Sequence, residues 1–385
     1  MPSLARVAVG QLGEVRTEQV RLFDHDSPLV LASGQRLSEV DVAYETYGEL
    51  SPEKDNAVMI CHALTGDAHA AGWHPGDRRP GWWDTLIGPG KPLDTDRLFV
   101  VCANLLGGCQ GTTGPASPDP ATGQPYGLDF PLLQVADFVT VHRALLAHLQ
   151  IPRLLGLVGG SLGGMQVLEW TLSHPDEVEN AVIVAASSRL SAQNIGFSAV
   201  GREAIMRDPE FSDGQYGARG TNPATGLAIA RMLAHITYLS EEAMATKFGR
   251  RIQDAEQSGP GFGVDFAVES YLRHQGDTFL TRFDALSYLY LTRAMDWFEP
   301  FSEHDAAAVA AAGTRVLVVS FDSDWRFSTA HSRAIVRQLE AARVRVSFRE
   351  VASPWGHDSF LLEVPDYHAT VRAFLDRALD RSPAA

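Results

Sequence analysis

Short apolar runs alternate with longer amphipathic segments over the first half of the chain. Four of these runs have the length and composition of buried strands. A stretch with alternating apolar and polar positions at residues 40–47, together with residues 20–31, predicts two more strands at an antiparallel edge. Apolar residues at helical spacing predict helices over residues 135–149 and about 164–172. The four apolar runs are residues 57–62 (AVMICH), 98–103 (LFVVCA), 154–158 (LLGLV) and 181–186 (AVIVAA).

The pattern changes after Ser187. Up to about Phe301 the chain has helical spacing without a convincing buried strand. Alternating strands and helices then return to the end of the chain, which is typical of a doubly wound, mostly parallel sheet. We therefore predict an α/β core over residues 1–190 and 311–385, with a helical insertion over 191–310 that we call the lid. The predicted lid helices are 192–206, 225–238, 241–250 and, with interruptions, 266–297; strands at 314–321 and 344–351 and helices at 329–342 and 366–379 follow.

One turn between a predicted strand and a predicted helix carries a serine. Its sequence is Gly159-Gly160-Ser161-Leu162-Gly163. A G-x-S-x-G pattern at a strand-to-helix turn is the nucleophile elbow of the α/β-hydrolase fold, in which a strained backbone lifts the serine hydroxyl above the sheet edge. The alternative is a glycine-rich turn with an incidental serine. The elbow predicts an α/β-hydrolase fold with Ser161 as nucleophile.

Acid and base partners for this serine follow late in the chain. Asp322 and Asp324 come directly after the predicted strand 314–321, and His357 precedes the last helix. Chain order Ser, Asp, His is that of α/β-hydrolases. A serine hydroxyl needs an imidazole to take its proton, and a carboxylate must hold that imidazole in the right tautomer. These residues predict a catalytic triad, with Asp322 and Asp324 both open as its acid.

Backbone N–H groups near the elbow can stabilise an oxyanion. In this fold one donor follows the nucleophile, and the other lies in the loop after the first core strand. Leu162 and Leu64, or a neighbour of Leu64, are therefore the expected donors. Two histidines on the helix 135–149, His142 and His148, are expected at its surface.

Composition restricts the possible partners. The chain has 385 residues, a formal net charge of -15 and no long cluster of Lys or Arg, which disfavours nucleic acid and anionic membranes as partners. Three cysteines without zinc-ligand spacing give no indication of a metal or a disulfide framework. No apolar run has the length of a signal peptide core or a membrane span. We expect a cytoplasmic protein.

Several longer motifs occur together with the elbow. They are residues 61–67 (CHALTGD), 81–84 (GWWD), 87–91 (IGPGK), 106–109 (LGGC), 159–166 (GGSLGGMQ), 247–250 (KFGR), 269–272 (ESYL) and 356–358 (GHD). In this order they resemble the homoserine O-acyltransferases, and the similarity runs from about residue 22 to 374. The resemblance implies a ping-pong transfer from an acyl-CoA co-substrate to the hydroxyl of L-homoserine, without a further cofactor, at the entry to methionine synthesis. It also implies that the triad is Ser161, Asp324 and His357.

The resemblance further implies how the acceptor is bound. Arg231 corresponds to a residue for the homoserine carboxylate and Asp358 to one for the ammonium group, with Tyr238 and Thr65 as weaker candidates. Family members are typically homodimers that pair through the lid. The apolar run at residues 288–291 (YLYL) suits that role, although burial within the lid explains it equally well.

The acyl donor is the remaining question, because members of the family use acetyl-CoA or succinyl-CoA. A succinyl group carries a terminal carboxylate and therefore needs a cation near the triad. Arg326, two residues after Asp324, gives a form (DWRF) that resembles the succinyl-using branch. We predict succinyl-CoA as donor and L-homoserine as acceptor. The alternatives are acetyl-CoA as donor, serine as acceptor, and a serine hydrolase or catalytically silent binding protein on the same fold.

Overall fold

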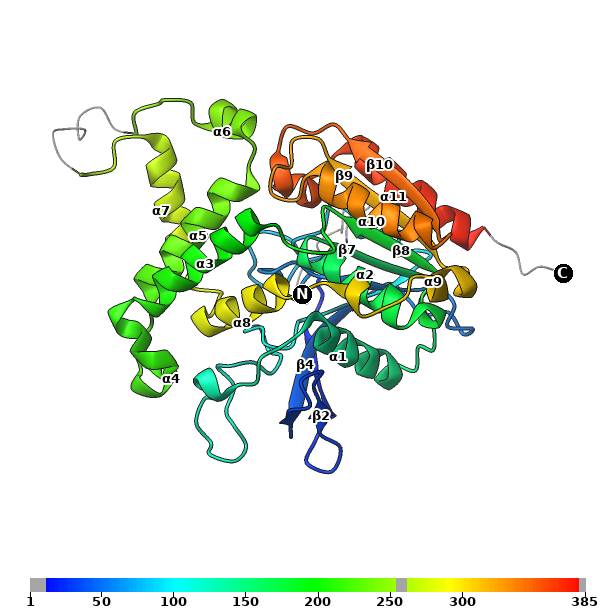
Figure 1. Ribbon diagram of the computed structural model, residues 1–385, viewed down its shortest axis with the longest axis horizontal. Helices are drawn as coiled ribbons and strands as arrows, with labels where there is room; N and C mark the ends of the chain where they lie inside the picture. Colours follow the sequence, from blue (N-terminus) through cyan, green and yellow to red (C-terminus); the bar gives the residue numbers. More distant parts are fainter. Residues whose placement is uncertain (1–11, 254–261, 381–385) are drawn as a thin grey trace, which may run out of the picture.

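The computed structural model describes residues 12–253 and 262–380. Within these residues, eight strands form one sheet in the order β1-β4-β6-β5-β7-β8-β9-β10 (Figure 1). Neighbours from β6 to β10 are parallel, whereas β1 and β4 are antiparallel additions at one edge. The predicted mostly parallel sheet with an antiparallel edge is confirmed. The strands are β1 (Glu18–Phe23), β4 (Val40–Tyr47), β5 (Ala57–Cys61), β6 (Phe99–Ala103), β7 (Gly156–Gly160), β8 (Asn180–Val184), β9 (Arg315–Phe321) and β10 (Arg345–Val351).

The single strand expected over residues 20–31 is two separate strands. β1 ends at Phe23, and a turn leads into β2 (Leu29–Val30), which pairs with β3 (Arg36–Leu37) in a small hairpin outside the main sheet. Asp24 causes this break, because its carboxylate accepts the backbone N–H groups of Asp26 and Ser27. Residues 24–28 (DHDSP) are polar and typical of a turn, so the sequence carried a signal for this break that the single-strand prediction did not use.

Helices cover both faces of the sheet, and the strand residues divide between them by alternation. Met59 and Cys61 of β5 face α1 (Val135–His148) and α2 (Leu162–Ser173), while Val58 and Ile60 belong to the opposite face. The first face is also covered by α10 (Thr329–Ala341). The second face is covered by α11 (Pro365–Leu379) and by apolar residues of the long connection between β5 and β6. This is the predicted doubly wound arrangement.

The lid helices lie together on one side of the sheet, between β8 and β9 in the sequence (Figure 1). Several begin at a polar cap: Ser191, Ser240 and Asp284 each accept a backbone N–H from the residue three positions later. A kinked 3-10 segment, Pro209–Gly214, was not expected, and α9 (Ala307–Ala312) leads back to β9. The lid helices are α3 (Ala192–Met206), α4 (Tyr216–Arg219), α5 (Ala224–Tyr238), α6 (Glu241–Lys247), α7 (Ala267–Phe279) and α8 (Ala285–Asp296).

The apolar run at residues 288–291 lies on α8 and is packed inside the chain. Its four side chains are only 1 to 7% exposed, and Gly201 of α3 lies against the Tyr288 ring. Tyr290 donates its hydroxyl to the backbone oxygen of Phe130, at 2.6 Å. Burial within the chain is therefore the correct interpretation of this run. Any contact between two copies would have to use other residues.

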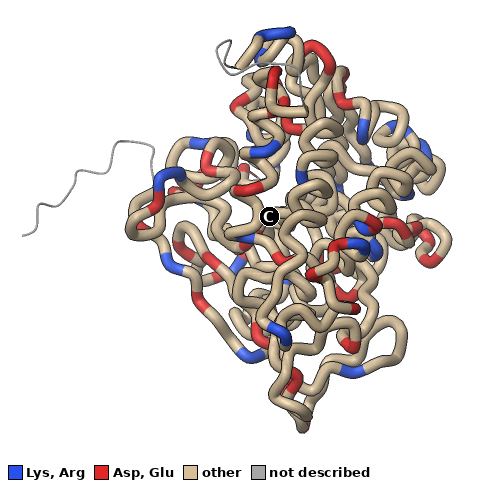
Figure 2. The backbone as a smooth tube through the Cα atoms, turned by 90° about the vertical axis from the view of Figure 1, so that its left-hand side faces the viewer, with Lys and Arg blue, Asp and Glu red and all other residues tan. Residues whose placement is uncertain are grey.

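Charges are mixed along the backbone. Seen from the side of the lid, basic positions are scattered among acidic ones (Figure 2). Among residues 12–253 and 262–380, no helix combines the length and apolar composition needed to cross a membrane.

Candidate active site

Ser161 lies at the sharp turn between β7 and α2. Its backbone angles are φ 58° and ψ -123°, a conformation that costs about 1 to 3 kcal/mol and that the surrounding packing must enforce. The glycines permit this packing. A Cβ at Gly163 would lie 2.0 Å from the Cys61 carbonyl oxygen, and one at Gly159 would lie 2.4 Å from the Gly163 backbone. The backbone of the elbow is therefore in direct contact with the end of β5.

The structure brings Ser161, His357 and Asp324 together. His357 Nε2 lies 2.9 Å from Ser161 Oγ, and His357 Nδ1 lies 2.7 Å from Asp324 Oδ2. All three side chains are buried, at 7% exposure or less. A hydroxyl, an imidazole and a carboxylate linked in this order can generate a serine nucleophile.

Asp324, not Asp322, faces the histidine. The second oxygen of Asp324 accepts the backbone N–H groups of Arg326 at 3.0 Å and Phe327 at 2.8 Å. Asp322 instead accepts the N–H of Ser353 and so ties the β9 and β10 loops together. The Phe327 ring stacks on the imidazole of His357 with centroids 4.8 Å apart, which fixes the plane of the base.

The two expected oxyanion donors belong to segments that touch. Leu162 is the first residue of α2, where a helix offers its N–H no partner within the helix. Leu64 lies in the turn three residues beyond the end of β5. Gln166 links the two segments, because its amide donates to the backbone oxygens of His62 at 3.0 Å and Leu162 at 3.2 Å.

The expectation that His142 lies at the surface is wrong. Its side chain is fully buried, and Nε2 donates to the Gln166 side-chain oxygen at 3.0 Å. Burial lowers the pKa of His142 to about 4, so the ring is neutral at pH 7. His148, by contrast, is exposed as expected. His142 thus orients the glutamine that holds both oxyanion segments.

His62 is a second buried histidine that organises this loop. Its Nδ1–H donates to the Ala63 backbone oxygen at 2.7 Å, and Nε2 accepts the N–H of Leu105 at 3.0 Å. Burial lowers the pKa of His62 and so keeps the ring neutral. A neutral imidazole can donate a hydrogen bond through Nδ1 and accept one through Nε2. Neither histidine was assigned a role from the sequence, because each depends on a contact with a residue more than 20 positions away, Leu105 for His62 and Gln166 for His142.

Arg326 is held inside the site on the loop that carries Asp324. Its side chain is 8% exposed, and Nη1 donates to the hydroxyl of Thr237 on α5. Its guanidinium carbon lies 5.3 Å from the centroid of the Tyr238 ring. Among the described residues no carboxylate forms an ion pair with Arg326. The arginine is therefore a buried cation without an ion-pair partner among residues 12–253 and 262–380.

Arg231, Tyr238 and Thr65 lie on the lid side of the triad. The Tyr238 ring is 5.9 Å from the His357 ring, measured between centroids. Arg231 also lies near Tyr238, with its guanidinium carbon 6.0 Å from the ring centroid. Its Nη1 donates to the hydroxyl of Thr65 at 3.4 Å. These three predicted substrate residues therefore form one continuous surface beside the base.

Asp358 directly follows the triad histidine and is partly buried. Burial raises the pKa of its carboxyl, and the nearby positive charges of His357 and Arg231 only partly offset that effect. An ammonium group next to this carboxylate would favour its charged form. The position and electrostatics of Asp358 suit the binding of a cationic substrate group.

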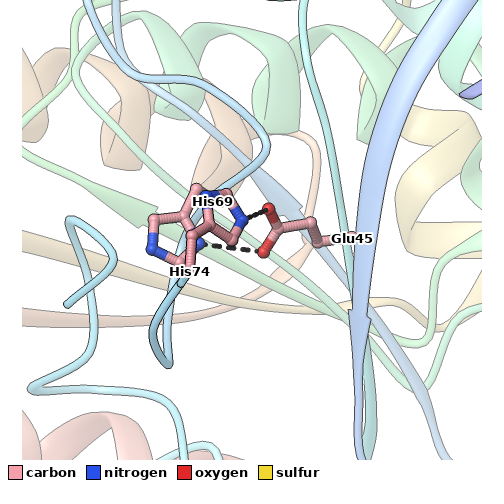
Figure 3. Close-up of side chains that lie close together, drawn as sticks. All are labelled: Glu45, His69 and His74. Atoms are coloured by element: carbon pink, nitrogen blue, oxygen red, sulfur yellow. Dashed lines mark hydrogen bonds and ion pairs between the residues drawn. The ribbon is translucent and has the colours of Figure 1, made fainter. Parts of the chain in front are cut away.

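A cluster beneath the oxyanion loop was not foreseen. Glu45 of β4 is completely buried, and His69 Nδ1 and His74 Nε2 lie 3.0 and 2.7 Å from its two oxygens (Figure 3). Thr17 and Tyr47 donate one further hydrogen bond to each oxygen. The two imidazoles are stacked face to face, with centroids 3.8 Å apart, so their in-plane lone pairs do not converge on one point. This is the geometry of a hydrogen-bonded cluster that anchors the loop to β4.

Comparison with known proteins places this geometry in a family. A family model described as the alpha/beta hydrolase fold matches residues 56–364. The homoserine O-succinyltransferase of Nocardioides sp. is 59% identical over 370 residues, which are 95% of this chain and 99% of that protein. The homoserine O-acetyltransferase of Rhodospirillum rubrum is 56% identical over 358 residues, 92% of each chain.

Two solved structures, one of a homoserine O-acetyltransferase and one of an esterase, share this fold. The homoserine O-acetyltransferase of Bacillus anthracis superposes with a TM-score of 0.86 at 26% identity, over 97% of this chain and 100% of that chain. Esterase E22 superposes with a TM-score of 0.84 at 27% identity, over 94% of this chain and 100% of the esterase. Relatives this similar over nearly the full length, on a fold with a serine elbow, establish that the chain belongs to the homoserine O-acyltransferase family of the α/β-hydrolase fold.

Proposed function

We propose that the protein transfers a succinyl group from succinyl-CoA to the side-chain hydroxyl of L-homoserine, giving O-succinyl-L-homoserine and CoA in methionine biosynthesis. The observation that carries the choice of donor is Arg326. It is buried on the triad loop, and no described carboxylate neutralises it. A buried guanidinium without a counterion suits an acyl chain that ends in a carboxylate. An acetyl group would leave this charge unpaired.

The first half-reaction forms an acyl-enzyme. His357 takes the proton of Ser161 as the hydroxyl oxygen attacks the thioester carbonyl. Asp324 holds the imidazole and stabilises its positive charge. The N–H groups of Leu162 and Leu64 stabilise the oxyanion of the tetrahedral intermediate. When the intermediate collapses, the C–S bond breaks and the CoA thiolate takes the proton from His357, which leaves a succinyl ester on Ser161.

The second half-reaction is the same chemistry in reverse, with homoserine in place of CoA. His357 takes the proton of the homoserine hydroxyl, whose oxygen attacks the ester carbonyl. The intermediate breaks at the Ser161 oxygen, and His357 returns the proton to it. Arg231 binds the acceptor carboxylate, and Asp358 binds its ammonium group. Transfer requires that homoserine reach the ester before water does.

The arrangement around Tyr238 supports a substrate with two acidic ends. Arg326 and Arg231 both lie near the Tyr238 ring, with guanidinium carbons 5.3 and 6.0 Å from its centroid, and the ring itself neighbours His357. In O-succinyl-L-homoserine the two carboxylates flank the ester at which the reaction occurs. We assign the succinyl carboxylate to Arg326 and the homoserine carboxylate to Arg231, with Thr65 and Tyr238 completing the acceptor site.

The deciding experiment is a comparison of donors. We expect kcat/KM for succinyl-CoA, measured by thiol release with L-homoserine, to exceed that for acetyl-CoA by at least about tenfold. A preference for acetyl-CoA would indicate that the protein is a homoserine O-acetyltransferase, the activity for which the R. rubrum relative is named. Thiol release without an O-acylated product would indicate a hydrolase, and equal turnover of L-serine would broaden the acceptor.

We also propose that the lid forms a distinct unit, over residues 191–310, that pairs two copies of the chain. The support is a set of exposed apolar side chains on α3 and α5, namely Val200, Ile229 and Ile236, which are 44 to 56% exposed. Light scattering after size exclusion should give twice the mass of the chain. A monomer at micromolar concentration would contradict this proposal.

A further inference from the structure

Two arginines lie side by side at the lid end of the site. Arg231 of α5 and Arg282, just after α7, both lie against the Phe279 ring, with guanidinium carbons 4.6 and 5.3 Å from its centroid. Phe279 is buried and stacks on Phe283, so the surface under both guanidiniums is rigid. The sequence had identified only Arg231.

Both arginines also contact the same residue of the oxyanion loop. Arg231 Nη1 donates to the Thr65 hydroxyl at 3.4 Å, and Arg282 Nη1 donates to the Thr65 backbone oxygen at 2.8 Å. Thr65 directly follows Leu64, the proposed oxyanion donor. Arg231 and Arg282 are therefore both held next to the loop that faces the acyl ester on Ser161. At this place they can contact a bound substrate.

The chain supplies no ion-pair partner to either guanidinium within the described residues. The nearest acids act only at longer range: Asp67 on Arg282, and Asp358 on Arg231. The side chain of Arg282 is exposed, but partial desolvation by the surrounding protein and the charge of Arg231 lower its pKa, which reflects the unfavourable approach of two like charges. In a chain of net charge -15, two adjacent cations without a counterion indicate a site for an anion.

We propose that Arg282 is a second guanidinium for the acceptor, so that the homoserine carboxylate binds between Arg231 and Arg282 across Thr65. This inference rests on the proposed function. A carboxylate has two oxygens with about four acceptor positions, enough for hydrogen bonds from two arginines. Arg282 is exposed, so it meets the carboxylate at the entrance, while Arg231 lies deeper beside Tyr238. A phosphate of CoA is the other anion that could use Arg282.

The test separates these two anions by half-reaction. With Arg282→Gln, KM for L-homoserine should rise about 10- to 100-fold, as expected for loss of a charge-assisted contact. Formation of the acyl-enzyme from succinyl-CoA, followed by mass spectrometry without acceptor, should be unchanged. L-homoserinol, which lacks the carboxylate, should react at similar rates with wild type and variant. Arg282→Lys should recover part of the affinity.

The matched control is Arg293→Gln, because Arg293 is also an exposed arginine over an aromatic ring, 5.0 Å from the Trp297 centroid at the far end of α8. An unchanged KM for homoserine in Arg282→Gln would overturn the proposal. A raised KM for succinyl-CoA in acyl-enzyme formation would assign Arg282 to a CoA phosphate instead. Failure of the wild type to acylate homoserine at all would refute the proposed function and not this site specifically.

Discussion

Replacing Arg326 by leucine should change the donor preference while leaving the triad intact. The substitution removes the guanidinium but keeps the backbone N–H that Asp324 accepts at 3.0 Å. A buried hydrogen bond to a charged group contributes about 2 to 3 kcal/mol. Loss of this contact to the succinyl carboxylate should therefore lower kcat/KM for succinyl-CoA roughly 30- to 150-fold. Acetyl-CoA offers no second carboxylate, so its kcat/KM should change little.

The assay is thiol release with saturating L-homoserine, for both donors and both proteins. Thr237→Val is the matched control, since it removes only the hydroxyl that accepts from Arg326 and should lower succinyl-CoA turnover less than about tenfold. Thermal melting should show that both variants fold. Equal losses with succinyl-CoA and acetyl-CoA would refute the reasoning and make Arg326 a structural residue.

Three further predictions follow from the site and its supports. Ser161→Ala should lower kcat by about four orders of magnitude or more and abolish the +100 Da succinyl adduct expected from the mass of a succinyl ester; a stable adduct on another residue would remove Ser161 from its role. Gln166→Ala should lower kcat about tenfold or more through the loosened oxyanion segments, with KM little changed, and a pure loss of stability without a kcat effect would contradict this. Glu45→Gln should lower Tm more at pH 6 than at pH 9. Burial lowers the pKa of His69, but the hydrogen bond with Glu45 and the negative charges of Glu45, Asp67 and Asp77 together outweigh burial and raise this pKa overall. The stabilisation is therefore complete below about pH 6.5 and lost as the pH rises through the folded pKa. A difference in Tm that is independent of pH would show that the cluster does not titrate.

The core of the fold could be predicted from the chain because its signals are local. Buried strands appear as apolar runs, and the elbow needs glycine at two fixed positions where the backbone of β5 and α2 meet. Chain order then gave the acid and the base. Asp322 and Asp324 could not be separated by spacing alone, because the choice depends on which carboxylate meets the imidazole of His357.

The supporting residues depend on contacts between distant segments and could not be predicted in this way. His142 has the spacing of the buried face of α1, three residues from both Val139 and Leu145. Its polar ring was nevertheless expected at the surface, because its buried partner, Gln166, lies on another helix. Glu45, His69 and Thr17 come from three segments that meet only in the fold. Arg282 touches Thr65 across 217 residues of sequence, and nothing near either residue indicates this contact.

The turn after β9 carries two residues with different roles, the triad acid Asp324 and, two positions later, Arg326, which we propose selects the donor. Asp324 is held by backbone N–H groups, so the side chain at position 326 is free to vary without disturbing the acid. If Arg326 selects the donor as we propose, a single substitution at position 326 would exchange the donor while Asp324 stays in place. Overall identity, 59% to a succinyltransferase and 56% to an acetyltransferase, does not separate the two donors, so on this proposal the residue at position 326 is the one to compare.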